Sequence, residues 1–116
     1  MKELSCIDLG EDQLPHDPEC CSIRMDAFIG PNDEPGADQF SFYVVTPNWL
    51  LEHPETRWGN GYLIVSTFTW QETRRMLERL ISHISAATWD EAAKKLSNNL
   101  EWEFHNYQPH SPSQNR

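Results

Sequence analysis

Alternation of hydrophobic and polar residues predicts strands in roughly the first two-thirds of the chain. Apolar side chains recur at every second position between residues 20 and 29, which predicts a strand with one buried and one wet face. Residues 40–46 are aromatic and β-branched, and residues 62–68 are apolar on both faces, as expected of a central strand. Residues 3–8 form a shorter candidate strand. Two prolines and two glycines at residues 30–37 predict a hairpin loop between the second and third strands.

The pattern then changes to a helical one. Thr69 and Glu72 match a capping box, and so do Thr88 and Glu91; each box precedes apolar residues spaced by three and four. Strands followed by helices predict an α+β fold, an antiparallel sheet of about four strands with two C-terminal helices packed on one face. The helical residues that we expect to be buried in this fold are Leu77, Leu80, Ile81, Trp89 and Leu96.

The length of 116 residues suits one domain. We assign it to residues 1–107, because residues 108–116 are polar, rich in Pro and Ser, and typical of a disordered tail. No run approaches the roughly 20 apolar residues that a membrane span needs. The first eight residues include two acids and no apolar stretch, so we expect no signal peptide. Three cysteines cannot all pair, which favours a reduced, cytoplasmic protein.

The charge of the chain is negative and unevenly distributed. The net charge is −9, and residues 1–40 carry ten acidic side chains against two basic ones, a net of −8. Residues 41–116 carry eight acids and seven bases. A surface of this sign disfavours binding to nucleic acids and to anionic membranes, which are themselves polyanions. It suits a basic protein partner, and the oligomeric state stays open.

Motifs for catalysis or metal binding are missing from the sequence. It contains no Walker loop, dinucleotide fingerprint, nucleophile elbow or His-Glu-x-x-His motif. Cys20 and Cys21 are adjacent and lack the spacing of a zinc site, and the five histidines are scattered. We therefore expect no catalytic residue, no bound metal and no cofactor, and the protein is not predicted to be an enzyme.

Two regions are candidate partner-binding sites. The first combines the wet faces of the second and third strands with the acidic loop between them, which a hairpin would hold on one side of the molecule. An ordinary solvated loop is the alternative interpretation. The second is a tryptophan in the glycine-rich turn before the fourth strand, where packing is the alternative to binding. The candidate residues are Asp26, Asp33, Glu34, Asp38, Tyr43 and Trp58.

Several stretches also follow one another in a familiar order. They are Thr-Pro-Asn-Trp-Leu at residues 46–50, Tyr-Leu-Ile-Val at residues 62–65, Trp-Asp-Glu at residues 89–91 and Trp-Glu-Phe at residues 102–104. In this order and spacing they resemble the Immunity protein 8 family of bacterial polymorphic toxin systems, over residues 1–107. The resemblance implies an α+β protein that is made beside a toxin, binds it and neutralises it in the cytoplasm without a catalytic site. It transfers no toxin-binding residue to this chain.

Three functions remain open at this point. The favoured one is an immunity protein that binds and neutralises a cognate bacterial toxin through an acidic surface. The alternative is an acidic regulatory or scaffold module that binds another protein. The third, a small acid/base hydrolase, is disfavoured by the missing motifs and by the resemblance.

Overall fold

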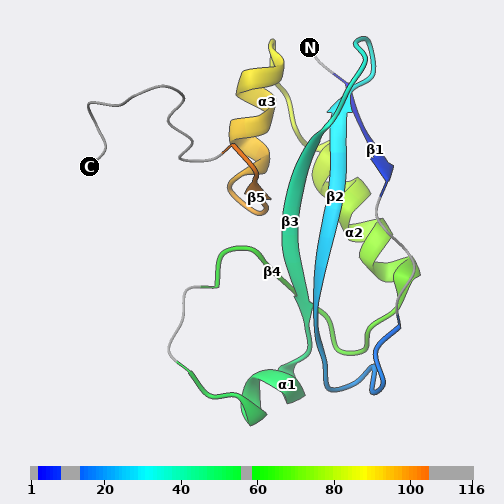
Figure 1. Ribbon diagram of the computed structural model, residues 1–116, viewed down its shortest axis with the longest axis vertical. Coiled ribbons are helices and arrows are strands. Elements are labelled where there is room, and N and C mark those ends of the chain that lie inside the picture. The colour runs from blue at the N-terminus through cyan, green and yellow to red at the C-terminus, as the bar shows by residue number, and fades with distance from the viewer. Residues whose placement is uncertain (1–2, 9–13, 56–58, 105–116) are drawn as a thin grey trace.

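The computed structural model describes residues 3–8, 14–55 and 59–104 of the chain (Figure 1). The strands are β1 (Leu4–Asp8), β2 (Ser22–Pro31), β3 (Asp38–Val45), β4 (Tyr62–Ile64) and β5 (Glu101–Trp102). The helices are α1 (Pro47–Glu52), α2 (Trp70–Ser82) and α3 (Trp89–Leu96). The strands form one sheet in the order β1-β2-β3-β4, and β5 also pairs with β3. The tail predicted at residues 108–116 lies outside the described residues.

The hairpin of β2 and β3 forms the centre of the sheet, as the alternating pattern predicts. The two strands are antiparallel, and β2 continues to Pro31 because β1 pairs with it there, with Leu4 opposite Pro31. The loop between β2 and β3 depends on two glycines. Gly36 has a φ of +96°, and a Cβ on Gly30 would lie 2.2 Å from the carbonyl oxygen of Gly36. Side chains at these positions would distort the hairpin.

The fourth strand differs from the expectation in length, position and direction. β4 spans only Tyr62–Ile64, lies at the edge of the sheet, and pairs in parallel with β3. The chain leaves β3 at Val45, passes through α1 and returns beside Tyr43, so β4 runs in the same direction as the last part of β3. Val65 and Phe68 are buried although they lie beyond the strand. Residues 62–68 are therefore apolar on both faces because the connection that follows β4 is buried. They do not form a central strand.

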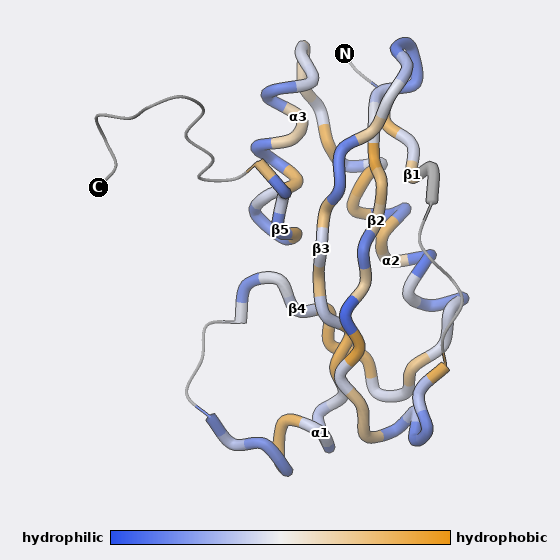
Figure 2. Tube along the Cα trace, in the orientation of Figure 1, coloured by the Kyte–Doolittle hydropathy of each residue, from blue (hydrophilic) through white to orange (hydrophobic). Residues whose placement is uncertain are grey.

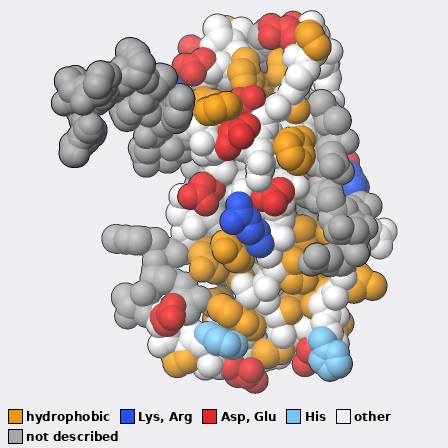
Figure 3. All heavy atoms as spheres, in the orientation of Figure 1, with side chains coloured by type: hydrophobic (Ala, Val, Ile, Leu, Met, Phe, Trp, Pro, Cys, Tyr) orange, Lys and Arg blue, Asp and Glu red, His pale blue; other side chains and the backbone are white. Residues whose placement is uncertain are grey.

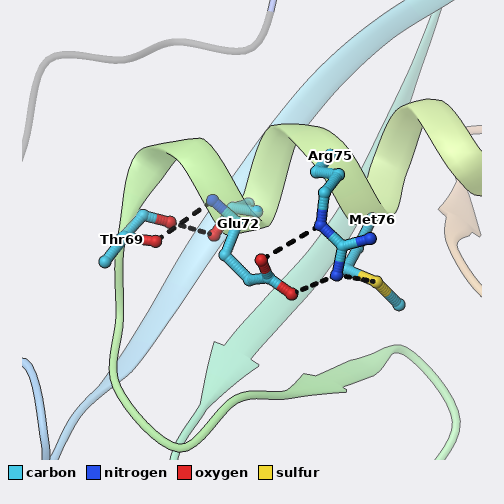
Figure 4. A network of polar contacts seen from close by, with 5 residues as sticks. Thr69, Glu72, Arg75 and Met76 are labelled. Carbon is cyan, nitrogen blue, oxygen red and sulfur yellow. Dashed lines mark hydrogen bonds and ion pairs between the residues drawn. The ribbon is translucent and has the colours of Figure 1, made fainter.

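Both predicted helix starts are confirmed. The Thr69 hydroxyl accepts a hydrogen bond from the Glu72 amide at 3.1 Å, and the Thr88 hydroxyl accepts one from the Glu91 amide at 3.2 Å. Figure 4 shows that the Glu72 carboxylate turns along α2 to Arg75, whose Nε lies 3.1 Å from Glu72 Oε1. The hydrogen bond from Arg75 lowers the pKa of Glu72. Glu72 thus belongs to an ion pair on the surface of the helix.

The main core lies between one face of the sheet and the helices α2 and α3. Leu77, Ile81 and Leu96 are buried in it as expected, whereas Leu80 and Trp89 are only half-buried at its margin. The sheet contributes side chains from alternate positions of β2 and β3, and Figure 2 shows hydrophobic and hydrophilic positions interspersed along both strands. The sheet residues of this core are Met25, Ala27, Ile29, Phe40, Phe42 and Val44, and Cys21 joins them from the position before β2. The α+β fold with two C-terminal helices is confirmed.

Candidate partner-binding face

The second face of the sheet, which α2 and α3 do not cover, is called the open face below. Strand alternation and register assign it the side chains of Arg24, Asp26, Phe28, Gln39, Ser41, Tyr43, Val45, Tyr62, Ile64 and Glu101. Three of its apolar side chains reach solvent, with exposed fractions of 36% for Phe28, 40% for Tyr43 and 60% for Ile64. In the view of Figure 3, acidic side chains flank a basic patch among hydrophobic ones. The face thus combines charge with exposed apolar area.

A hydrogen-bonded network occupies the middle of the open face. Asp26 lies opposite Ser41 in the register, and the Ser41 hydroxyl donates to Asp26 Oδ1 at 2.7 Å. Arg24 Nε lies 3.3 Å from the same oxygen, and its Nη2 donates to the Ser41 hydroxyl at 3.1 Å. Desolvation raises the pKa of Asp26, but hydrogen bonds from Ser41 and Gln39 and the charge of Arg24 outweigh it, so the pKa is lowered overall. The network holds Asp26 as a carboxylate.

The lowered pKa gives a testable dependence of stability on pH. Because the folded-state pKa of Asp26 lies below its unfolded value, its ionised form stabilises the fold above the unfolded pKa of about 3.9, and this contribution is lost as pH falls through the folded pKa. Asp26→Asn keeps an acceptor for Ser41 but removes the charge. We expect it to lower the free energy of unfolding by about 0.5 kcal/mol at pH 7.

Urea denaturation of both proteins between pH 2 and pH 7 measures this effect. The difference between the parent and Asp26→Asn should shrink as the solution is acidified. A difference that stays constant across the series would contradict a stabilising charge at Asp26. Arg24→Gln is the matched control, because it removes the other charge and should produce a loss of similar size at pH 7.

Asp38 lies away from the open face. Strand alternation puts it on the same side of β3 as Phe40, towards the helices. Its Oδ2 accepts hydrogen bonds from Trp89 Nε1 at 3.1 Å and from Trp102 Nε1 at 3.0 Å. Phe40 stacks on Trp102 and meets Trp89 edge to face. Asp38 therefore ties α3 and β5 to the start of β3, so its carboxylate already has two partners within the protein.

The other acidic candidates lie at the tip of the hairpin. Asp33 and Glu34 are exposed in the loop between β2 and β3, whereas Tyr43 lies towards the opposite end of β3. At about 3.3 Å per residue, the five steps from Asp38 to Tyr43 already span roughly 16 Å. The structure therefore brings Asp26 and Tyr43 together and leaves the loop acids apart from them. Trp58 lies outside the described residues.

The open-face residues that sequence reasoning missed include Tyr62 and Glu101. The ring of Tyr62 in β4 stacks on that of Tyr43, with centroids 5.7 Å apart and an interplanar angle of 22°. Glu101 in β5 lies opposite Ser41 and is exposed. Tyr62 was expected in a buried strand, and the two-residue β5 has no periodicity from which a strand can be read. The sequence therefore carries no local signal for Glu101.

Strand pairing along the edge of β3 that faces away from β2 is interrupted at Phe42. β4 pairs with residues 43–45 and β5 pairs with residues 40–41, so Phe42 has neither strand beside it. A cavity of about 330 Å³ opens on the helix side of this gap, and one of about 230 Å³ opens on the other side beside Arg24, Tyr43 and Glu101. We call them the helix-side cavity and the open-face cavity. Phe42, Tyr62 and Leu100 line both.

Acidic side chains lie near the thiols of Cys20 and Cys21. No group of three or more His, Cys, Asp or Glu side chains there is placed to hold a metal ion. Desolvation raises the pKa of Cys20, helped by a hydrogen bond to Glu52, and desolvation also raises that of Cys21. A raised pKa leaves less of the reactive thiolate. No helix among these residues is long and apolar enough to cross a bilayer.

Comparison with known proteins identifies a family. The family model described as Immunity protein 8 matches residues 1–107, which include all the described strands and helices. No curated protein and no solved structure matches the chain.

Proposed function

Because the chain belongs to the Immunity protein 8 family, we propose that it binds a cognate bacterial toxin in the cytoplasm and neutralises it by occupying a functional surface of that toxin. The family match over residues 1–107 is the observation that carries this proposal. Inhibition then needs affinity and fast capture and requires no chemistry from the inhibitor.

The open face is the proposed toxin-binding surface. Binding energy at protein interfaces is concentrated in a few well-packed residues, among which tyrosine is frequent. The stacked rings of Tyr43 and Tyr62 present such an anchor, and Phe28 and Ile64 extend its apolar area. Asp26 and Glu101 lie around it. Of these two acids, Asp26 is paired with Arg24, so Glu101 supplies the more available negative charge.

The charge of the chain favours a basic toxin. The net charge of −9 produces a long-range attraction for a cationic partner, which raises the association rate. A carboxylate on the inhibitor can also take the place of a phosphate when the toxin acts on a polyanion. Asp33 and Glu34 at the hairpin tip contribute to this attraction even where they make no contact with the toxin.

Stopped-flow association with an inactivated form of the toxin encoded beside this chain tests the proposal. We expect the association rate to fall steeply with added salt while the dissociation rate changes little. Tyr43→Ala should accelerate dissociation by about tenfold or more, as expected for an interface anchor. Glu101→Gln should slow association at low salt. Asp33→Asn with Glu34→Gln at the hairpin tip should slow association and leave dissociation unchanged, and is therefore the control for the effect of Tyr43→Ala on dissociation.

The outcomes separate the function from the surface. Absence of binding to this toxin would overturn the immunity function and favour the regulatory or scaffold alternative. Tight binding that the tip variant weakens, and that Tyr43→Ala and Glu101→Gln leave unchanged, would keep the function and move the site to the loop. Circular dichroism confirms that each variant is folded before its rates are compared.

A further inference from the structure

The helix-side cavity lies where the core is incompletely covered. It opens between β4, α2 and the segment that joins α3 to β5, and has a volume of about 330 Å³. It exists because neither β4 nor β5 continues beside Phe42. Leu63 and Leu80 are consequently only half-buried, although both pack against the core. A site of this size falls within the range of small-molecule pockets, about 300–1,000 Å³.

The wall of the helix-side cavity is apolar at its base. Phe42, Leu77 and Leu100 are buried, with exposed fractions of 5% or less, and they belong to the same hydrophobic cluster. Leu63 and Leu80 form the sides of the cavity. An apolar body that displaced water from this surface would gain the free energy of burying it. The base therefore selects an apolar group.

The polar side chains at the cavity are cationic or neutral. Among the residues that the structure describes, Arg79, His83 and Asn99 line it, and no carboxylate does. Arg79 forms no ion pair within the described residues, whereas Arg75, one turn earlier on α2, is paired with Glu72. His83 is held in place by the hydrogen bond between its Nδ1 and the carbonyl oxygen of Arg79, at 2.8 Å. On a chain with a net charge of −9, this is a local site for an anion.

We propose that the helix-side cavity binds a small carboxylate with an apolar body. The apolar body lies against Phe42, Leu77 and Leu100, and the carboxylate pairs with the Arg79 guanidinium, which can bind both of its oxygens. The carbonyl end of the α2 dipole disfavours an anion in this region, so Arg79 must supply the attraction. The site lies on the helix side of the sheet and shares only Tyr62 with the open-face residues named above, and it does not depend on the proposed function.

Titration of the whole chain with sodium octanoate, followed by amide NMR, tests this site. Octanoate should shift the amide signals of Leu63, Leu80 and Leu100 in a saturable manner below its critical micelle concentration. Octanol is the neutral probe of the same chain length and should bind more weakly. Arg79→Gln should weaken octanoate binding by about tenfold, as expected for loss of a charge-assisted hydrogen bond, and should leave octanol binding unchanged.

Two further variants make the result decisive. Arg75→Gln removes the same charge from the same helix outside the cavity, and should not alter octanoate binding. Met76→Trp places a larger side chain in the cavity wall, and should abolish binding of both probes. The proposal is overturned if octanoate produces no saturable shifts at these residues. It is also overturned if octanoate and octanol bind alike, or if Arg79→Gln and Arg75→Gln have equal effects.

Discussion

Replacing Leu96 with alanine should lower the free energy of unfolding by about 2–5 kcal/mol, the usual range for a buried leucine. Leu96 has no exposed surface and ends α3, where it packs into the cluster shared by β2, β3 and α2. The substitution removes apolar contacts and leaves a cavity at a site that cannot collapse easily, because the sheet forms one of its walls. Urea denaturation followed by circular dichroism measures the loss.

Leu80→Ala is the matched control for this prediction. Leu80 is half-buried and already borders the helix-side cavity, so truncation there enlarges an existing space and removes fewer contacts. We expect a loss of about 1 kcal/mol, well below that for Leu96. Equal losses for the two variants would contradict the description of the helix-side cavity as an uncovered part of the core.

Replacing Asp38 with alanine should cost about 2–4 kcal/mol. The substitution leaves the indole N–H groups of Trp89 and Trp102 without their shared acceptor, and each part-buried donor that loses its partner costs about 1–3 kcal/mol. The two indoles also hold their rings against Phe40, so their release loosens the contacts of α3 and β5 with β3. Urea denaturation measures the loss, and tryptophan fluorescence should shift towards that of exposed indole.

Two substitutions test the specificity of this effect. Asp38→Asn retains one carbonyl oxygen as an acceptor but loses the charge, so its cost should be intermediate. Asp33→Ala removes the same charge from the exposed hairpin loop and should change stability by no more than about 0.5 kcal/mol. Asp38→Ala that behaves like Asp33→Ala would show that the indole hydrogen bonds contribute nothing to stability.

The parts of the fold that sequence reasoning predicted are those that depend on local signals. The capping boxes at Thr69 and Thr88 place the helix starts within the first turn, because the N-cap hydroxyl accepts from the backbone amide three residues further on. Alternation along β2 and β3 identifies their buried faces, because successive side chains of one strand point to opposite faces of the sheet. The α+β arrangement follows from the order of these elements.

The parts that were missed depend on contacts between distant residues. The parallel pairing of β4 depends on the path that the chain takes through α1. The hydrophobic periodicity of the sequence does not indicate that path. β5 has two residues, and only its pairing with β3 identifies it as a strand. The indole partners of Asp38 are 51 and 64 residues away. The grouping of Asp38 with the loop acids used neighbourhood in the sequence as a guide, whereas strand alternation already points it towards the helices.

Only part of the candidate face could be predicted, because strand alternation is a local signal and strand pairing is not. The wet positions Asp26 and Tyr43 follow from alternation alone, and the structure places them on neighbouring strands of the open face. Tyr62 and Glu101 join them only through the pairing of β4 and β5 with β3. Such residues can be assigned to the open face only when the pairing of the strands is known.

The gap in strand pairing beside Phe42 brings one side chain, that of Tyr62, to both faces of the sheet. Tyr62 lines the cavities on both sides of the gap, and its ring stacks on Tyr43 in the proposed toxin-binding surface. If the toxin binds the open face as proposed, a ligand in the helix-side cavity that favours one position of the Tyr62 ring would alter the free energy of toxin binding. Thermodynamic reciprocity requires the toxin to change the affinity for that ligand by the same factor. A missing stretch of strand thus provides a physical route by which a small molecule would tune the neutralisation of a toxin.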